Sequence, residues 1–597
     1  MPQFALAAQF PPATRDQWRA LVAAVLTRSA VAVDDPERAL SHPTYDGFDL
    51  LPLYTADNAP ADPSWPTAPA AAAMRRAVGG AGWDVRQRHA DPDPARANAA
   101  ILADLANGAT SIWLTLGPGG IAIADLPRVL DGVHLGLAPV ALDAGPLAGV
   151  AAPALFAVAA SGGVPADQLT GTLGWDPFGA RARTGAVADL GELFDSVAAA
   201  REYSNLIPIT VDGTVYHDAG GSDAEEIAVV AAVAVAYVRA LTDRGFGVAE
   251  AFRLVESRYA VNADQFASIA KLRAARRVWD RIGELCGLTP TDCVMRQHAV
   301  TSRAMLTRRD PWVNLLRTTV ACFAAATGGA DVITVEPFDS ALGIPDDFGR
   351  RLARNTQSIL DTESSLARVA DPAAGSWYVE SRTEQIAEAA WAQFTNIERL
   401  GGAATALESG HLQGLLGATQ QARAAAIAHR RDAITGVSEF AFIDEEPVVR
   451  SPYPPVTTVP PVPLMSAHRY AEAFEALRDH ADAQAVRPMV FLAALGSVAA
   501  HTARVEFARN LFAVGGIASV VGTGEIDEIV AAFVASGATL ACLCSSDSVY
   551  AEQADVMTGA LLAAGARAVW TAGHDLYAGG NAVDVLSRAF DIVGAAR

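Results

Sequence analysis

The chain has few cysteines, and no two of them form a Cys-x-x-Cys pair. Its 597 residues contain five, namely Cys286, Cys293, Cys322, Cys542 and Cys544. An odd and sparse set of this kind indicates a reducing compartment and argues against a cysteine-based zinc site. Cys542 and Cys544 lie two positions apart in an apolar run, so we expect both to point from one strand into the core.

Long hydrophobic runs and targeting signals are missing as well. The longest apolar stretch, Ile227 to Val238, is far shorter than the ~18 residues that a membrane-spanning helix needs. Residues Met1 to Phe10 have neither the basic start nor the apolar core of a signal peptide. We therefore expect a soluble, cytoplasmic protein.

Positive charge is scarce. The chain carries 45 Lys and Arg against 66 Asp and Glu, a formal net charge of −21. Nucleic-acid binding needs concentrated Lys and Arg, so this balance argues against it. What remains is an ordinary globular composition, with 51% hydrophobic residues, 49 Gly and 33 Pro. The length predicts two or three domains, because a single core does not grow this large.

A proline-rich segment, PVVRSPYPPVTTVPPVP at 447–463, divides the chain. Closely spaced prolines favour an extended and stiff connector. We expect a helix at 470–481 and then a regular alternation of apolar strands and amphipathic helices. The strands are predicted at 488–495, 517–521, 538–544 and 566–571, and the helices at 502–513, 525–535, 548–564 and 582–593. This rhythm predicts a flavodoxin-like doubly wound parallel sheet of four or five strands, with its ligand-binding edge at the loop after Leu495.

The larger N-terminal part also alternates, with predicted strands at 110–116, 207–211 and 331–335. Residues 223–241 form a helix that is apolar almost all round, so we expect it to be buried. Repeated strand–helix units over this length favour a (β/α)8 TIM barrel, although periodicity alone does not decide between a barrel and a doubly wound sheet. We therefore expect an α/β protein with an arm containing one helix at 1–44, a barrel at 45–440, a linker and helix at 441–485, and the flavodoxin-like domain at 486–597.

Several segments resemble the methylmalonyl-CoA mutase family. Residues 49–55, DLLPLYT, are similar to the family's I-K-P-L-Y-T, and residues 83–87, WDVRQ, to its W-T-I-R-Q. GTLGWDP at 171–177 falls where the family has G-T-I-Q-N-D, and Tyr216-His217 followed by Ala219-Gly220 resembles Y-H-x-x-E-A-G. The longest similar stretch runs from Arg317 to Glu380 and ends in DPAAGSWYVE. The order and distances of these segments make the resemblance specific over nearly the whole chain.

This resemblance implies a barrel that holds an acyl-CoA and a flavodoxin-like domain that holds adenosylcobalamin. The family's chemistry is a radical 1,2-rearrangement that begins with homolysis of the cobalt–carbon bond. The cofactor carries that chemistry, while the protein orients the groups and excludes water.

The chain departs from the family at the cobalamin loop. Catalytic members have Lys-x-Gly-x-Asp-x-His-x-x-Gly, in which the His binds cobalt and the Asp orients the His. Here the Lys, Asp, His and last Gly positions are Ala494, Val498, Ala500 and Ala503, respectively. His501 stands one residue late, and sliding the register to use it puts Ala499 at the Asp position and Arg504 at the Gly position. An Arg side chain would there occupy the space of the cofactor tail, so we expect His501 to begin a helix and to bind no metal.

The barrel departs from the family as well. The Tyr after W-T-I-R-Q is Arg88, the Thr-Met-Tyr segment upstream is replaced by an Ala- and Gly-rich stretch at 71–82, and His-x-Gln-Thr-Ser-Gly becomes HAVTSR at 298–303, with Val300 in place of Gln. Tyr216 and His217 are retained. His217 could recognise a substrate carbonyl or could be a packing residue, and we favour packing, because a lone donor without cofactor cannot run the reaction.

We therefore predict that this chain has no catalytic, cofactor-binding or metal-binding residue. The resemblance then implies the small, non-catalytic subunit of a 1:1 heterodimer that interconverts (R)-methylmalonyl-CoA and succinyl-CoA, with adenosylcobalamin and the acyl-CoA bound by the large catalytic subunit. Two alternatives stay open. The chain could serve as a subunit of, or an active mutase for, another acyl-CoA such as isobutyryl-CoA, or it could be a stand-alone binding or repair partner of the mutase.

Overall fold

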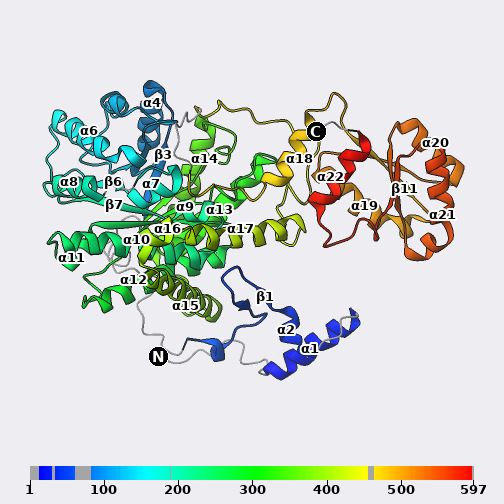
Figure 1. Cartoon of the computed structure of the whole chain (residues 1–597), viewed down its shortest axis with the longest axis horizontal. Helices are drawn as coiled ribbons and strands as arrows, with labels where there is room; N and C mark the ends of the chain where they lie inside the picture. The colour runs from blue at the N-terminus through cyan, green and yellow to red at the C-terminus, as the bar shows by residue number, and fades with distance from the viewer. Residues whose placement is uncertain (1–12, 30–33, 61–81, 188–189, 455–462, 595–597) are drawn as a thin grey trace.

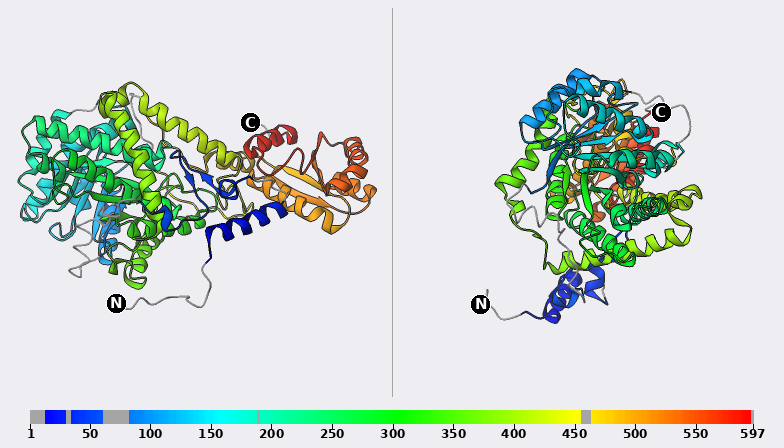
Figure 2. Two further views of the ribbon diagram at one scale, coloured as in Figure 1. Left: turned by 90° about the horizontal axis from the view of Figure 1, so that it is seen from below. Right: turned by 90° about the vertical axis from the view of Figure 1, so that its left-hand side faces the viewer.

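The structure is a computed structural model that describes residues 13–29, 34–60, 82–187, 190–454 and 463–594. It has two lobes, a large barrel lobe and a smaller C-terminal lobe, joined by helices and extended chain (Figure 1). The N-terminal helices lie outside both lobes (Figures 1 and 2). Among the described residues, no helix is long and apolar enough to cross a membrane.

Eight parallel strands close into a barrel in the order β10-β3-β4-β5-β6-β7-β8-β9. The strands are β3 (Asp84–His89), β4 (Ser111–Thr115), β5 (Val140–Asp143), β6 (Gly171–Trp175), β7 (Leu206–Asp212), β8 (Val255–Val261), β9 (Arg296–Thr301) and β10 (Val332–Thr334). Each strand pairs with its neighbour in sequence, and β10 closes the ring against β3. The TIM-barrel prediction is confirmed, and the three strands expected from the sequence are β4, β7 and β10.

Helices surround the barrel. They are α4 (Pro94–Ala106), α5 (Leu126–Val129), α6 (Ala148–Ser161), α7 (Pro177–Thr184), α8 (Leu190–Ala200), α9 (Thr214–Asp218), α10 (Asp223–Asp243), α11 (Val248–Arg253), α12 (Gln265–Leu285), α13 (Asn314–Thr327) and α14 (Asp347–Ser358). A second layer follows with α15 (Trp377–Arg399), α16 (Gly402–Glu408) and α17 (His411–Ala428). Helix α10 is buried along most of its length, as predicted, because α15 and α16 cover the face that the barrel does not.

The C-terminal lobe is a four-stranded parallel sheet in the order β12-β11-β13-β14. Its elements are α18 (Glu472–Asp482), β11 (Met489–Ala494), α19 (Val498–Val514), β12 (Ala518–Gly522), α20 (Ile526–Ser536), β13 (Leu540–Cys544), α21 (Asp547–Ala563), β14 (Ala568–Thr571) and α22 (Ala582–Val593). Leu492 packs with Phe512 of α19 on one face, and Phe491 packs with Phe533 of α20 on the other. Helices therefore cover both faces, and the doubly wound prediction is confirmed.

Two local predictions need correction. The helix after β11 begins at Val498 rather than near Thr502, because Ser497 is extended and its carbonyl already accepts from the amides of Ala500 and His501. His501 therefore lies within the first turn instead of starting the helix. The arm contains two helices, α1 (Arg15–Arg28) and α2 (Pro36–Leu40), rather than one. Pro36 is the first residue of α2, a position that its fixed φ favours.

The N-terminal arm is attached by few contacts. Residues of α1 are all at least partly exposed, and the helix is fastened to α2 by the Arg15–Glu37 ion pair at 2.5 Å. A short hairpin follows, formed by β1 (His42–Pro43) and β2 (Asp49–Leu50). Both views in Figure 2 show α1 outside the ring of barrel helices.

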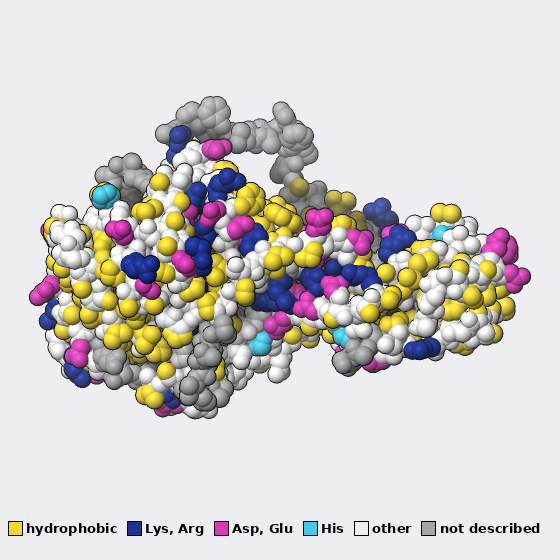
Figure 3. All heavy atoms as spheres, turned by 90° about the horizontal axis from the view of Figure 1, so that it is seen from above, with side chains coloured by type: hydrophobic (Ala, Val, Ile, Leu, Met, Phe, Trp, Pro, Cys, Tyr) yellow, Lys and Arg dark blue, Asp and Glu magenta, His cyan; other side chains and the backbone are white. Residues whose placement is uncertain are grey.

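Ion pairs join the two lobes. Arg308 lies 3.1 Å from Glu475 and 2.6 Å from Asp479, and Arg309 lies 2.8 Å from Asp482. Figure 3 shows charged side chains of both signs gathered between the lobes on the face drawn there. Of the predicted proline-rich connector, residues 455–462 lie outside the described residues, and the part before them is extended chain that bridges to the barrel lobe between Ser451 and Ile344.

Cys542 and Cys544 both point into the core between the sheet and the α19/α22 layer, as the sequence predicts, and both are fully buried free thiols.

Strand β6 approaches β5 so closely that it needs glycine. The backbone of Gly174 has φ +69°, and a Cβ there would lie 1.9 Å from the carbonyl oxygen of Leu142. The register between β6 and β7 shifts between Thr172 and Trp175, which is where this glycine sits. Gly163, after α6, has nearly the same φ of +68° but open space around it.

These two glycines give a matched test. Gly174→Ala should lower the free energy of unfolding of the barrel by about 2–4 kcal/mol, because the methyl group collides with backbone. Gly163→Ala should cost only about 1 kcal/mol, the price of the left-handed conformation alone. Urea unfolding followed by tryptophan fluorescence measures both, and equal losses would contradict the close approach of β6 to β5.

Candidate functional site

The barrel axis is occupied by large side chains. Trp113 of β4 has the guanidinium of Arg258 4.1 Å and that of Arg88 5.1 Å from its ring centroid. The ring of His298 meets Trp113 edge-on at 5.3 Å. Trp113, Arg258 and His298 are each at most 4% exposed. This part of the barrel is thus a packed core.

Below Trp113, buried charges pair with one another. Arg86 lies 3.4 Å from Glu256, which in turn contacts Arg296 at 3.0 Å. Burial, together with the neighbouring Arg86 and Arg258, lowers the pKa of His298 well below its ordinary value, so this imidazole is neutral. A buried charge is tolerated only when it is paired in this way.

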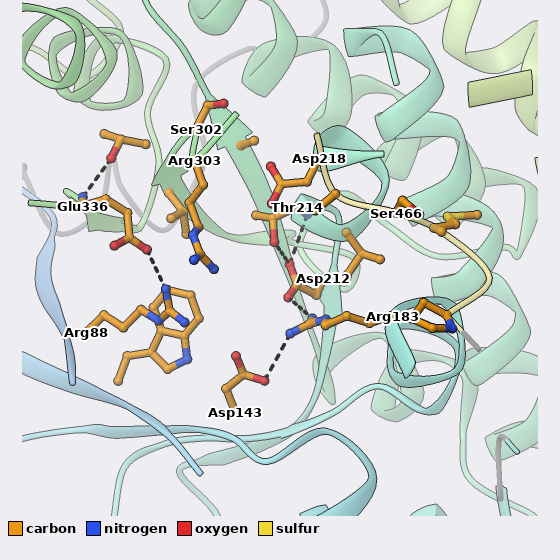
Figure 4. Close-up of a pocket in the computed structure, with 18 residues that line it drawn as sticks. Arg88, Asp143, Arg183, Asp212, Thr214, Asp218, Ser302, Arg303, Glu336 and Ser466 are labelled. Carbon is orange, nitrogen blue, oxygen red and sulfur yellow. Dashed lines mark hydrogen bonds and ion pairs between the residues drawn. The ribbon is translucent and has the colours of Figure 1, made fainter. Parts of the chain in front are cut away.

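A cavity of about 400 Å³ remains at the mouth of the barrel (Figure 4), and Trp113 forms part of its lining. It is lined by the carboxyl ends of the strands and by the residues that follow them, namely Arg88, Trp113, Asp143, Arg183, Asp212, Thr214, Val215, Asp218, Ala260, Val300, Thr301, Ser302, Arg303 and Glu336. Residues 463–467, after the proline-rich segment, form its remaining wall. This is the end of a TIM barrel at which active sites are found.

The chain after the proline-rich segment is tied to the barrel mouth by backbone hydrogen bonds. The amides of Leu464 and Met465 donate to the carbonyl oxygen of Ala182 at 3.1 and 3.0 Å. Farther on, the amide of Tyr470 donates to the carbonyl oxygen of Ala304 at 2.8 Å. The connector therefore covers one side of the cavity and fixes Tyr470 beside the barrel rim.

Most charged side chains in the cavity wall neutralise one another. Arg88 lies 3.0 Å from Glu336, and Arg183 lies 2.6 Å from Asp212 (Figure 4). Asp212 also contacts Arg258 at 3.1 Å. Burial alone would raise the pKa of Asp212, but Arg258 and Arg183 outweigh it and lower this pKa to about 2. The carboxylate is ionised at neutral pH and held as the centre of a charge cluster.

His217, which the sequence retains, is engaged within the chain. Its Nε2 lies 2.7 Å from the hydroxyl of Ser302 and 3.4 Å from that of Tyr470, and its Nδ1 lies 3.4 Å from Glu226. The side chain is 2% exposed and faces a neighbouring cavity of about 640 Å³, lined also by Tyr45 of the N-terminal hairpin region. These contacts agree with a packing role and leave its function a prediction.

The positions that depart from the family lie where a substrate would be expected. Arg88 forms the Glu336 pair at the cavity wall, and Val300 packs with Trp113 and Ala141. Gly174 stands where the family pattern has Gln, and the glycine conformation described above leaves no room for a side chain. Of the Ala- and Gly-rich stretch at 71–82, residues 71–81 lie outside the described residues.

In the C-terminal lobe, Arg504 lies across the carboxyl edge of the sheet. It donates to the carbonyl oxygen of Ser545 and to the carboxylate of Asp547, both at 2.6 Å. Its guanidinium lies 4.9 Å from the ring centroid of Tyr550 and so close to Gly573 that a Cβ there would clash at 2.7 Å. Arg504 thus occupies the cleft beside the loop that follows β11.

Tyr550 completes this edge. Its hydroxyl accepts from the amide of Ser545 at 2.8 Å and lies 3.0 Å from the carbonyl oxygen of Leu543 and 2.9 Å from that of Ala572. Strands β13 and β14 are therefore bridged by a side chain of α21 at the point where a doubly wound sheet binds its ligand.

The loop residues themselves carry no ligand set. Val498 is 73% exposed, and Ala500 offers only a methyl group. The Nδ1 atom of His501 is buried without a hydrogen-bond partner in the described part of the chain. Within that part, no group of three or more His, Cys, Asp or Glu side chains could hold a metal ion.

The sequence analysis did not identify the residues that line the barrel mouth or bridge the edge of the C-terminal sheet, namely Trp113, Asp143, Arg183, Asp212, Asp218, Glu336 and Tyr550. Asp143 and Asp212 each end an apolar strand, and charged residues in that position indicate the ligand-facing end of a parallel sheet. The sequence therefore contains a signal for Asp143 and Asp212. It contains none for the pairing of Arg88 with Glu336, which lies 248 positions away.

Comparison with known proteins agrees with the resemblance. The family model described as methylmalonyl-CoA mutase matches residues 113–532. A methylmalonyl-CoA mutase small subunit of Streptomyces virginiae is 50% identical over 99% of this chain and 98% of its own length. A protein of the same name from Propionibacterium freudenreichii subsp. shermanii is 39% identical over 99% of this chain and 97% of its own. A methylmalonyl-CoA mutase of Rhizobium meliloti is 29% identical over 69% of this chain and 63% of its own.

Two substitutions in the C-terminal lobe distinguish Tyr550, which stabilises the edge of the sheet, from His501, which we expect to contribute little to stability. Tyr550→Phe should lower the free energy of unfolding by about 1–3 kcal/mol, because it leaves the amide of Ser545 unpaired. His501→Ala should stay within about 0.5 kcal/mol of wild type. Urea unfolding of both variants tests this, and a larger loss for His501→Ala than for Tyr550→Phe would contradict the assignment.

Proposed function

Because the chain belongs to the methylmalonyl-CoA mutase family, whose members are isomerases, we propose that it is the small, non-catalytic subunit of a heterodimeric mutase. Its large partner interconverts (R)-methylmalonyl-CoA and succinyl-CoA, and both chains reside in the cytoplasm. One observation carries the proposal: this chain's own side chains occupy the barrel axis below the mouth cavity and the cleft at the carboxyl edge of the C-terminal sheet. The relatives named small subunits, similar over nearly their full length, support the same role.

The substrate side is supported by the barrel core. An acyl-CoA reaching the mouth through the barrel would have to displace Trp113, which is clamped between Arg258 and Arg88. Displacing Trp113 would remove the ring that packs against the guanidinium groups of Arg258 and Arg88, and disrupting the surroundings of buried charges is costly. Val300 in the cavity wall stands where the family pattern has Gln, and Gly174 of β6 leaves no room for the other Gln of that pattern.

The cofactor side is supported by the C-terminal cleft, whose residues do not fit adenosylcobalamin. Neither Val498 nor Ala500 can ligate cobalt or orient a ligand, and the side chain of Arg504 occupies the cleft beside this loop through its contacts with Ser545 and Asp547. In our proposal the cofactor is therefore bound by the large subunit alone and supplies the radical chemistry there.

The chain's own contribution is to stabilise the folded partner by binding it. Helix α1 is a surface suited to that task. Leu21 is 70% and Val25 50% exposed, four positions apart on one side of the helix. A helix of 14 residues is marginal by itself. We propose that its apolar side packs on the large subunit.

Cofactor stoichiometry tests the division of labour. The co-purified heterodimer should bind one adenosylcobalamin, all of it in the large subunit, as measured by equilibrium dialysis. A heterodimer whose large subunit lacks its cobalt-ligating histidine should bind none at comparable affinity. Two cofactors per heterodimer would show that the C-terminal cleft of this chain opens to admit one.

The arm is tested by charge insertion. Leu21→Asp with Val25→Asp should weaken the heterodimer at least about tenfold, because buried apolar anchors dominate such interfaces. Leu137→Asp serves as the control, since Leu137 is 83% exposed in the segment of the barrel lobe between α5 and β5. Analytical ultracentrifugation of both complexes gives the dissociation constants. Unchanged association of the double variant would exclude α1 from the interface.

A further inference from the structure

Among the residues that the structure describes, two charged side chains at the barrel mouth have no ion-pair partner. Seven charged residues of this described part line the cavity, namely Arg88, Asp143, Arg183, Asp212, Asp218, Arg303 and Glu336. Five of them are held in pairs, since Arg88 contacts Glu336 and Arg183 contacts both Asp143 and Asp212. In the described part of the chain, neither Arg303 nor Asp218 has an oppositely charged side chain within 4.0 Å.

Arg303 is the cation of this unpaired set. It lies two residues after the end of β9, where the family pattern has Gly, and Figure 4 shows it reaching towards the middle of the cavity. Its guanidinium donates no hydrogen bond to another described residue. A guanidinium presents a planar fork of N–H donors that matches a carboxylate.

Asp218 is the anion. It ends α9, and its backbone carbonyl oxygen accepts from the amide of His468 at 2.7 Å, which fixes its position at the wall. Its carboxylate accepts no hydrogen bond from the described residues. Burial raises its pKa, although His217 and Arg303 act in the opposite direction. A carboxylate in this setting gains from a donor or a cation within the cavity.

The charge balance of the wall narrows the class of ligand. Three arginines face four carboxylates, a net charge of −1, which disfavours a phosphate or another polyanion. A simple carboxylate would satisfy Arg303 and leave Asp218 unpaired. A simple amine would do the reverse. A molecule that carries both a carboxylate and an ammonium group satisfies both side chains.

We propose that the barrel mouth binds a small zwitterion of amino-acid size, with its carboxylate on Arg303 and its ammonium group on Asp218. The cavity of about 400 Å³ suits such a ligand. Residues 463–467 close it from the side, with Ser466 in the wall (Figure 4). This binding site goes beyond the proposed supporting role and does not depend on it.

Isothermal titration calorimetry on the purified full-length chain, and on the heterodimer, tests the proposal without any variant. The probes are glycine, β-alanine and 4-aminobutyrate, which differ in the separation of their charges, with propionate and propylamine as analogues that carry one charge each. At least one zwitterion should bind about tenfold or more tightly than both analogues. Binding of none of the three zwitterions, or equal binding of propionate, would overturn the proposal.

Variants locate the site. Arg303→Ala and Asp218→Asn should each weaken binding of the preferred zwitterion by about tenfold or more. Arg351→Ala is the matched control, because Arg351 is also exposed and, within the described part of the chain, its side chain forms no ion pair and contacts the ring of Phe348 at 5.2 Å. The control should bind as wild type. Unchanged affinity of Arg303→Ala would place the ligand elsewhere, including in the partner subunit, and would overturn the assignment.

Discussion

The pairing of buried charges governs the interior of this barrel. Arg86, Glu256, Arg258 and Asp212 lie at most 4% exposed, in a region where an unpaired charge would cost several kcal/mol. Each is tied to a partner on another strand, so the strands are held in one arrangement by their inward side chains as well as by backbone hydrogen bonds. Trp113 closes the spaces between these charges. The barrel axis around Trp113 is therefore filled with side chains and does not form a channel.

The same requirement extends to the outer layer. Lys271, the only lysine of the chain, is 1% exposed and lies 2.5 Å from Glu226 and 3.1 Å from Asp223. Glu226 also accepts from the amide of Ala260 at 2.9 Å and faces His217. One buried carboxylate thereby connects α9, α10, α12 and β8. His217 therefore belongs to a buried network of polar side chains, which agrees with a packing role.

In the C-terminal lobe, side chains of the same chain satisfy polar backbone groups at the carboxyl edge of the sheet. Strand ends leave polar backbone groups that must be satisfied. Tyr550 and Arg504 satisfy these groups at β13 and β14 from within the chain. The lobe can therefore keep the doubly wound fold without a ligand at its carboxyl edge.

The sequence by itself predicted both folds. Apolar strands separated by amphipathic helices predicted the doubly wound sheet, whereas the choice of a barrel for the N-terminal part also needed the resemblance to the family, because periodic burial alone did not decide it. It also determined which motif residues are absent, such as Val498 and Ala500 in the cobalamin loop, since identity at a fixed spacing is a local property. Helix limits were less accurate, as at α19, because the carbonyl of Ser497 rather than a polar side chain starts that helix.

Only the tertiary structure decided what replaced the missing groups. Arg88 meets Glu336, and Arg504 meets Asp547, across long stretches of chain. Such contacts depend on which strand ends come together when the barrel and the sheet close, and no local pattern records that. For the same reason, the sequence does not show that Arg303 and Asp218 lack an ion-pair partner among the described residues. That follows only from the positions of the other charged side chains at the barrel mouth.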